Sequence, residues 1–412
     1  MAKGEEGRPG LGAPLLPQQQ KSAPEGRASA WQTFFNIVVS ILGTGVLGLP
    51  FAFKTAGWLV ASLIILLAGV STFYSMILLV ECRKSLEEKG VPEIFSYGDI
   101  GALAFGRIGR YATEITILVS QCGGSVAYLV FIGQNLASIF ASYHLSQAFL
   151  IFLCLTPVEV ALSFIRPLSA LSPFSAFADL CNVLAMAIVV KRDLQLLPGS
   201  FPATKAVTTF SALPFTLGVA VFCFEGLSMT LPLESSMAEP ARFPACLARA
   251  FSGITLVYIF FGFLGYAAFG DATMDIVTLN LPGGWWSAAV KVGLCVALVF
   301  ALPIMMHPVH EIIEAKLRDA GSSSTCRWAE PLARGFAVVA MAAVASFVPG
   351  FGMFVSLVGS TVCALLSFVF PAALHLKLVG GAALSPGRKA LDVFILLFGL
   401  AFAAYGAASN VH

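Results

Sequence analysis

The sequence predicts an all-α polytopic membrane protein with eleven transmembrane helices, arranged as a 5+5 inverted repeat plus one extra helix at 390–408. The composition indicates the membrane class. Of the 412 residues, 58% are hydrophobic and 11% are charged, and the mean hydropathy is +0.87, whereas soluble domains carry about 25% charged residues. Two apolar segments, one in each half of the chain, are interrupted by glycine and proline, and this pairing indicates the repeat.

A bilayer core takes about 20 apolar residues per helix, and the chain supplies about eleven such stretches. They are predicted at 31–53, 57–82, 110–141, 148–166, 173–190, 208–232, 247–270, 285–310, 331–348, 351–376 and 390–408. Residues 1–30 are polar, contain Pro, Gly and Gln, and have no apolar core ahead of a cleavage site. We therefore expect a disordered cytosolic tail and no cleavable signal peptide.

The positions of the basic residues predict the orientation. Apart from Lys291 inside a helix, the Lys and Arg residues on one side of this arrangement are only Lys54, Lys191, Arg192 and Lys205. The remainder lie on the other side, which the positive-inside rule assigns to the cytosol together with the N-terminus. No cysteine falls in a predicted non-cytosolic loop and no N-x-S/T sequon occurs, so we expect no structural disulfide, and an internal membrane is favoured.

The first interruption lies in the segment "LGTGVLGLPFAF", where Gly43, Gly45 and Gly48 precede Pro50. Glycine weakens a helix interior, and proline removes a donor and clashes with the preceding turn. In lipid, non-helical backbone is tolerated only where it is buried in protein or lines a wet cavity. A helix that unwinds near Thr44 is therefore expected to bind something there.

The second interruption lies in "FCFEGLSMTLPLESSM", where Glu225 and Gly226 fall in mid-membrane and Pro232 follows. The two halves, 31–192 and 208–376, have matching lengths and five predicted helices each. Because five is odd, the second half must cross the membrane in the opposite sense to the first. Interrupted helices at corresponding positions of two such halves are typical of a transporter binding site.

Unwound turns expose backbone N–H and C=O groups, and the ends of half-helices carry partial charge. A zwitterionic amino acid suits such a site, because its carboxylate faces the N–H groups and its ammonium group faces the carbonyls. An aromatic ring at the second break would close over the substrate side chain. The predicted substrate-binding residues are Gly43, Thr44, Gly45, Phe224, Glu225, Gly226 and Tyr128. The alternative is that the glycines mark close helix packing, which is common in membranes.

Two of these residues allow two interpretations each. An unpaired carboxylate at the bilayer centre costs at least about 2.5–3.5 kcal/mol, so Glu225 is paired, protonated or beside water. It is the proton-coupling candidate, or it is a structural carboxyl that ties the unwound turns together. Tyr128 shares a helix face with Gln121 and Ser125, and this polar stripe contacts either the substrate or a neighbouring helix.

Other polar residues within the predicted helices are expected to be structural. Asp179 would pair with Asn182, Glu159 would cap carbonyls freed by the kink at Pro157, and His307 would be an interfacial side chain. The sequence contains no metal-ligand cluster, no nucleotide-binding glycine loop and no nucleophile–base pair. Neither an enzymatic activity nor a metal or cofactor is predicted.

Several stretches resemble the amino acid/auxin permease superfamily: "GTGVLGLPFAFKTAGW" (Gly43–Trp58), "FEGLSMTLPLESSM" (Phe224–Met237) and "SLVGS" (Ser356–Ser360). Others, including "SYGDIG" (Ser96–Gly101) and "PIMMHPVHEIIE" (Pro303–Glu314), are similar to its plant vacuolar neutral amino acid transporter branch. The resemblance extends over most of the chain.

This resemblance implies a LeuT-type fold and the movement of small neutral amino acids, such as alanine or proline, across the vacuolar membrane toward the cytosol. It places the family's glycine-rich break at Gly43, Thr44 and Gly45, and its helix-6 "FEG" at Phe224–Gly226. The animal proton-coupled relatives carry a histidine where this chain has Asn36, so a shared proton-coupling step is not implied.

We therefore hypothesise a secondary transporter that works by alternating access around the two interrupted helices. Its partners would be a small neutral amino acid, protons and the lipid bilayer. One alternative is an amino acid sensor that binds without significant flux, and another is a plasma-membrane importer of the same fold. A channel is not indicated, because no helix shows a ring-forming charge or filter pattern.

Overall fold

The computed structural model of the chain describes residues 28–409, except 92, 93, 95, 165–167, 198–203, 321–328 and 381–383. Within these residues, regular structure is helical apart from one isolated parallel bridge between Ala28 and Met237. Most of the predicted N-terminal tail lies outside the described residues. The all-α prediction is therefore confirmed for the part of the chain that can be described.

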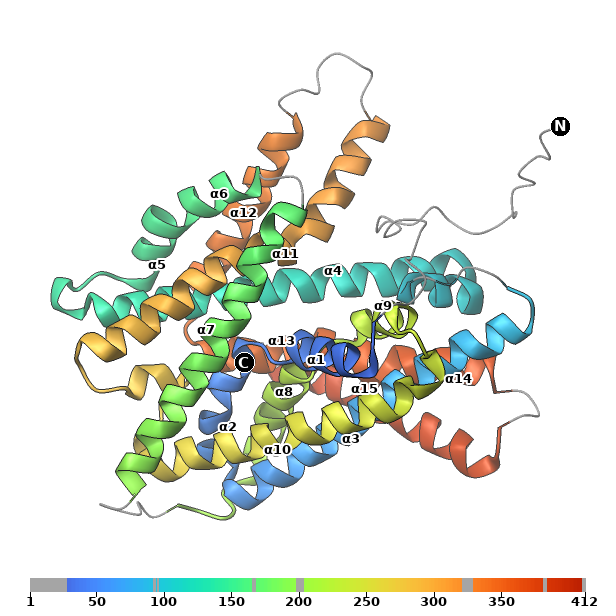
Figure 1. The fold of residues 1–412 in the computed structure, drawn as a ribbon, viewed down its shortest axis with the longest axis horizontal. Coiled ribbons are helices and arrows are strands. Elements are labelled where there is room, and N and C mark those ends of the chain that lie inside the picture. Colours follow the sequence, from blue (N-terminus) through green and yellow to red (C-terminus); the bar gives the residue numbers. More distant parts are fainter. Residues whose placement is uncertain are drawn as a thin grey trace.

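The helices differ widely in length, and short 3₁₀ or π-helical segments join several of them. In Figure 1, α3 and α10 lie side by side. The α-helices are α1 (Ala30–Ile41), α2 (Leu49–Ala56), α3 (Trp58–Glu88), α4 (Tyr97–Ile139), α5 (Gln147–Leu150), α6 (Thr156–Ser163), α7 (Leu168–Leu196), α8 (Leu213–Cys223), α9 (Thr230–Ser236), α10 (Phe243–Phe269), α11 (Trp285–Ala320), α12 (Ala329–Phe347), α13 (Phe351–Val358), α14 (Phe370–Leu378) and α15 (Pro386–Ser409).

Among the described residues, eight helices are long and apolar enough to cross a membrane, or nine if the bent pair Ala30–Ile41 and Thr44–Ala56 forms one span. The apolar helix Gln147–Ser163 is shorter. It falls in the predicted range 148–166, and α7 covers the predicted range 173–190. The polytopic class is thus confirmed, while the count of eleven spans stays a prediction.

One boundary differs clearly from the prediction. α4 begins at Tyr97 rather than at 110, because a separate first segment is capped and then kinked. The Ser96 hydroxyl accepts the N–H of Asp99 at 3.2 Å, and the Asp99 carboxylate accepts the N–H of Ser96 at 3.0 Å. The chain then turns at Gly106 (φ 65°), a left-handed conformation that favours glycine. Hydropathy alone recovers only the apolar part after that turn.

Close glycine contacts position α2, the helix that follows the first interruption. A Cβ atom at Gly262 of α10 would lie 2.4 Å from the Phe53 ring, and one at Gly265 would lie 2.6 Å from Pro50. Small residues allow this approach of helix backbones in a membrane protein. Since α2 is seated directly on α10, the unwound turn ahead of it is held against the same helix.

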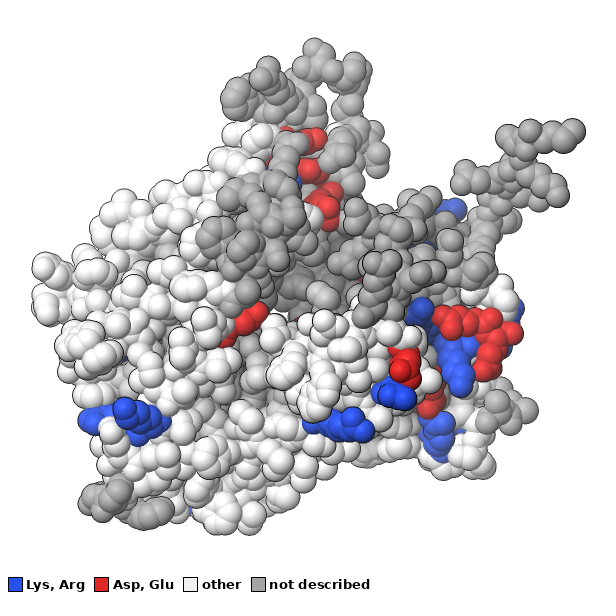
Figure 2. Space-filling model, in the orientation of Figure 1, with Lys and Arg blue, Asp and Glu red and all other residues white. Residues whose placement is uncertain are grey.

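The surface has the character expected of a protein in lipid. Large apolar side chains are exposed, among them Phe210 (87%), Phe347 (87%) and Trp31 (73%). Figure 2 shows the charged side chains of one face gathered mainly where α3 ends and α10 begins, with a broad uncharged surface beside them. A hydrocarbon core tolerates such an uncharged surface, whereas the charged end requires water or headgroups.

Candidate substrate-binding site

The first helix is interrupted between α1 and α2. α1 ends at Ile41, and helical structure resumes at Thr44 as a 3₁₀ turn that leads into α2. Gly43 between them is extended (φ −97°, ψ −176°), and the two helical parts are bent by 49°. The side-chain amide of Asn182 on α7 donates to the carbonyl of Leu42 at 3.1 Å. A neighbouring helix thus satisfies one of the carbonyls that the interruption frees.

The second interruption lies between α8 and α9. α8 ends at Cys223, and a 3₁₀ turn over Leu227–Met229 leads into α9. Gly226 has extended backbone (φ 172°), and the N–H of Glu225 donates to the carbonyl of Phe222 at 3.2 Å. Residues at such helix ends leave N–H and C=O groups without helical partners.

The two interruptions are in contact with each other. A Cβ atom added at Gly45 would lie 3.1 Å from the sulfur of Cys223 and 3.2 Å from the Phe222 ring. One added at Gly226 would lie 3.2 Å from the side chain of Ile41. These distances are tighter than ordinary Cβ contacts. Two of the predicted glycines therefore allow the unwound segments to approach closely.

Tyr258 of α10 joins both interruptions through one hydroxyl group. Its oxygen lies 3.0 Å from the carbonyl oxygen of Ile41 and 3.0 Å from that of Cys223. The residue is fully buried, and a hydroxyl has one hydrogen, so it donates to one carbonyl at a time. Sequence reasoning missed Tyr258, because nothing distinguishes it from the other aromatic residues of that apolar helix.

Phe224 is placed differently from the prediction that its ring closes over a substrate. The ring is fully buried, stacks on Phe251 (centroids 5.9 Å apart, planes at 15°) and lies 5.1 Å from the Tyr258 ring. Its edge also faces Gly69 of α3, where an added Cβ would lie 3.1 Å away. In this conformation the ring belongs to the packing between α3 and α10, and Phe224 offers only its backbone to the interruption.

Glu225 and Tyr128 face a shared environment. Both are partly buried, and the Glu225 carboxylate is close enough to interact electrostatically with Tyr128 and Tyr97 of α4 and with Cys363. Among the described residues, no side chain or backbone group donates a hydrogen bond to this carboxylate. A partly buried carboxylate without a protein donor is available to water, a proton or a ligand.

Of the predicted glycines at the two interruptions, Gly43 has free space beside it. A Cβ atom there would meet nothing within 4 Å, in contrast to Gly45 and Gly226. The adjacent N–H groups of Thr44 and Gly45 begin the 3₁₀ turn and have no helical acceptor. Open space next to unpaired donors is what a small anionic group requires.

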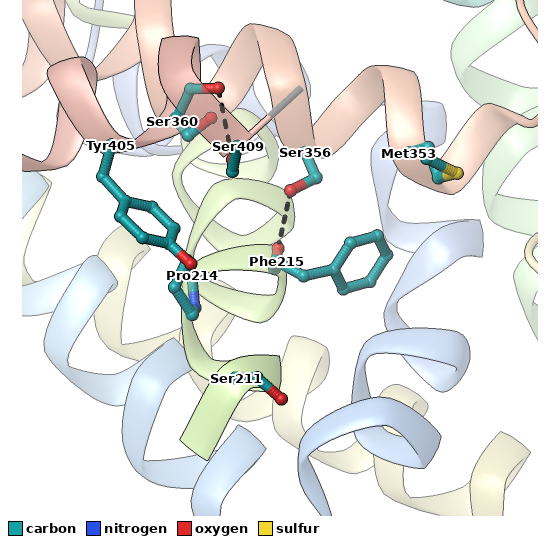
Figure 3. A pocket seen from close by; sticks show the side chains of 9 residues that line it. Ser211, Pro214, Phe215, Met353, Ser356, Ser360, Tyr405 and Ser409 are labelled. Atoms are coloured by element: carbon teal, nitrogen blue, oxygen red, sulfur yellow. Dashed lines mark hydrogen bonds between the residues drawn. The ribbon is translucent and has the colours of Figure 1, made fainter. Parts of the chain in front are cut away.

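A cavity lies away from both interruptions. It has a volume of about 160 Å³ and is enclosed by the start of α8, by α13 and by the end of α15 (Figure 3). Its polar lining includes Ser356, whose hydroxyl donates to the carbonyl of Phe215 at 3.0 Å, and Ser360. No predicted substrate-binding residue lines it. This cavity therefore does not coincide with the predicted substrate site, which is defined by the backbone geometry of the two interruptions.

Two structural expectations are wrong. Asn182 donates to Leu42 and not to Asp179, because α7 lies against the end of α1. The buried Glu159 does not cap carbonyls near the Pro157 kink, since neither of its oxygens has a hydrogen-bond partner among the described residues. By contrast, His307 lies 3.3 Å from Glu311, one helical turn away on the same helix, and is partly exposed.

Comparison with known proteins agrees with this geometry. A family model described as "Transmembrane amino acid transporter protein" matches residues 26–411. The chain is 53% identical over 402 residues to amino acid transporter ANT1 of Arabidopsis thaliana, covering 93% of each protein. It is 30% identical over 395 residues to vacuolar amino acid transporter 3 of Schizosaccharomyces pombe, covering 92% of this chain and 58% of that protein.

Among solved structures, the chain is similar to Mhp1, a nucleobase–cation symporter, with a TM-score of 0.55 and 11% identity over 97% of this chain and 96% of the other. At that identity the likeness concerns the fold alone, and it confirms the predicted LeuT-type arrangement. The match to the family model and the identity to the plant relative concern the sequence over nearly its whole length. The chain therefore belongs to the family of transmembrane amino acid transporter proteins, the amino acid/auxin permease family.

Proposed function

We propose that this chain is a secondary transporter that moves small neutral amino acids across the vacuolar membrane toward the cytosol. The halves 31–192 and 208–376 act as inverted repeats, and access alternates around the two interruptions. The observation that carries the proposal is the meeting of the two breaks at Tyr258, with open space beside Gly43. Interrupted helices that meet in mid-membrane are the recurrent substrate site of transporters built from inverted repeats.

The chemistry of the breaks suits a zwitterion. The N–H groups of Thr44 and Gly45 open the 3₁₀ turn and face the α-carboxylate, since helix N-termini bind anions. Carbonyls at the end of α8, followed by those of Phe224 and Glu225, accept the ammonium group. The side chains packed against the glycines of the breaks, Ile41, Phe222 and Cys223, are apolar. A substrate with an uncharged side chain is therefore favoured over one that brings a further charge.

Proton coupling is assigned to Glu225. This carboxylate lies directly beside the second break and has no protein hydrogen-bond donor among the described residues. Tyr128 and Tyr97 of α4 lie within electrostatic range of it. A carboxyl that binds and releases a proton next to the substrate links the two binding events in one step.

The membrane and the direction are also part of the proposal. Several relatives carry the word vacuolar in their names, including the fission yeast protein. The distribution of Lys and Arg favours a cytosolic N-terminus. A fluorescently tagged copy located by microscopy tests the membrane assignment, and labelling at the plasma membrane would contradict it.

The transport activity is tested with purified protein in lipid vesicles. Uptake of labelled alanine and proline is compared with that of glutamate and lysine, with and without an imposed pH gradient. We expect uptake of the neutral amino acids alone, stimulated when the substrate side is acidic. Protein-free vesicles are the control.

Two results would overturn the proposal. Binding of alanine without uptake would indicate a sensor, and equal uptake of lysine would remove the assignment to neutral substrates. Uptake that ignores the pH gradient would contradict only the proton-coupling part.

A further inference from the structure

A cluster of ionisable side chains lies away from the proposed substrate site, where α3, α14 and α15 meet. The ring of His375 on α14 is fully buried between two carboxylates: Nδ1 lies 2.7 Å from Asp392 of α15, and Nε2 lies 3.1 Å from Glu81 of α3. The Tyr74 hydroxyl donates to the second oxygen of Asp392 at 2.7 Å, and Arg388 donates to Glu81 at 2.5 Å.

The number of hydrogens in this cluster can be counted. A neutral imidazole has one N–H and can donate from one nitrogen only, whereas both nitrogens of His375 face carboxylate oxygens. Both contacts are attractive only when an additional proton is present, either on the ring or on one of the carboxyl groups. The geometry therefore describes a site that holds one exchangeable proton.

The charges support the same conclusion. With the proton bound, His375 and Arg388 balance Glu81 and Asp392. Without it, one negative charge is left over, although Asp392 is completely buried, and an uncompensated buried charge is strongly unfavourable. Other titratable groups near the cluster are Cys82 on α3, Lys89 directly after α3, and Tyr97 on α4.

The contacts also indicate which hydrogen bond of His375 depends on the bound proton. Among the described residues, Asp392 has His375 and Tyr74 as its hydrogen-bond partners, whereas Glu81 keeps Arg388 in either state. A neutral ring therefore keeps its N–H on Asp392 and presents the lone pair of Nε2 to Glu81. Loss of the proton removes the hydrogen bond between α3 and α14, while Tyr74 and Glu81 of α3 keep their hydrogen bonds to α15.

Both helices joined by this contact lead to the second interruption. On α3, Gly69 faces the Phe224 ring, and Met76 is the side chain that a Cβ at Gly226 would approach at 3.8 Å. α14 follows two π-helical segments, Gly359–Cys363 and Leu365–Val369. The first of these lies directly on α8, at Gly218, and π-helical segments are frequent at functional sites.

We propose that Glu81, His375 and Asp392 form a proton-binding site, distinct from Glu225, that restrains transport while its proton is bound by fastening α3 to α14. The site lies where α3 ends and α15 begins, on the side predicted to be cytosolic. A rise in pH on that side frees α14 from its hydrogen bond to α3 and increases flux. The effect on flux rests on the proposed transport function, whereas proton binding at the cluster does not.

The experiment uses Glu81→Ala, which removes the α3 partner of the ring and leaves the buried His375–Asp392 pair in place. Glutamine is not used, because its amide N–H would donate to the lone pair of a neutral His375. The matched control is Glu87→Ala, on the same helix, where an exposed carboxylate pairs with Arg83 at 2.8 Å. Exchange of labelled alanine across vesicles at equal pH on both sides is measured from about pH 5.5 to pH 8. The native chain is measured in parallel, so that any contribution of Glu225 to the pH dependence is common to all three proteins.

We expect exchange by the native chain to rise at least about threefold across this range, since one titrating group allows up to about tenfold per pH unit. With Glu81→Ala the rate should be high already at low pH and should depend much less on pH, and with Glu87→Ala it should follow the native chain. The same pH profile in Glu81→Ala and in the native chain would overturn the proposal.

Heat unfolding of the purified protein gives a second readout that needs no flux. The contacts are complete only with the proton bound, so the Tm of the native chain should fall as the pH rises, and that of His375→Gln should not follow. Equal pH dependence of Tm in both proteins would overturn the proton site. A Tm difference without alanine exchange in any variant would support the proton site and contradict the transport function.

Discussion

The Tyr258 hydroxyl oxygen lies 3.0 Å from the carbonyl oxygen of Ile41, at the end of α1. The same hydroxyl is equally far from the carbonyl of Cys223 at the end of α8. One hydrogen serves two acceptors, so whichever carbonyl lacks it depends on another donor or stays unpaired. Any movement of one half-helix relative to the other must therefore change this hydrogen bond.

Replacement of Tyr258 by phenylalanine tests this link. The ring packing against Phe224 remains, but a buried carbonyl loses its donor, which costs about 1–3 kcal/mol. We expect a lower Tm and a transport rate reduced several-fold, measured by heat unfolding and by alanine uptake in vesicles. Tyr143→Phe is the control, because that side chain is 74% exposed. Unchanged Tm and rate in Tyr258→Phe would show that the hydroxyl does not hold the two breaks.

Substitution by alanine should have different effects at Gly43 and at Gly45. The added methyl group at Gly45 would press on Cys223 and Phe222, and overpacking of this kind costs about 1–3 kcal/mol. At Gly43 the backbone is extended and the space is open, so stability should be unchanged while KM for alanine rises. Gly253→Ala, also in open space, is the control for both.

The measurements are Tm and the concentration dependence of uptake for all three variants. If the space beside Gly43 does not hold the substrate, Gly43→Ala will have the KM of the native protein.

Glu225→Gln should uncouple uptake from the pH gradient. The amide keeps the size of the side chain but cannot carry a proton, so uptake should continue down a substrate gradient and lose its stimulation by acid. The measurement is initial uptake with and without the gradient. Glu159→Gln is the comparison, because Glu159 is a buried carboxyl that lies in α6, away from the breaks. Stimulation that survives in Glu225→Gln would assign proton coupling to another group.

The sequence permits prediction of the fold and of the two interruptions, because glycine, proline and hydropathy act locally along the chain. The glycines at 43, 45 and 226 lie at these interruptions. Tyr258 and Asn182 could not be predicted, because their importance comes from carbonyls on other helices. His375 carries no local signal either, since its two carboxylate partners are distant in sequence.

The orientation of the Phe224 ring could not be predicted from the sequence either. An aromatic residue beside a break suggests a lid, but the direction of its ring depends on the space that Gly69 leaves on α3. Likewise the start of α4 depends on the turn at Gly106, which a hydropathy window does not register. Residue type therefore indicates where the chain unwinds, while packing between distant helices decides what each side chain faces.

Arg334 joins three helices through a buried ion pair and a hydrogen bond. Arg334 of α12 donates to Glu314 of α11 at 2.5 Å and to the carbonyl of Ser163 in α6 at 2.7 Å. Both charged side chains are about 6% exposed. Removal of one partner leaves a buried charge, which costs about 3–5 kcal/mol. We therefore expect Arg334→Leu to lower Tm strongly, and Arg334→Lys to lower it as well, because a single ammonium does not reproduce the geometry of the guanidinium fork.

The double variant Arg334→Met, Glu314→Met separates the charge from the packing. Since replacement of a whole buried pair by apolar residues is often neutral or stabilising, it should recover much of the loss seen in Arg334→Leu. Arg242→Leu is the control, because its pair with Glu239 is exposed on both sides and surface pairs contribute little. Heat unfolding gives the Tm of each of the four variants and therefore their order of stability. A double variant no more stable than Arg334→Leu would mean that Arg334 acts mainly by its hydrogen bond to Ser163 and its packing between α6 and α11.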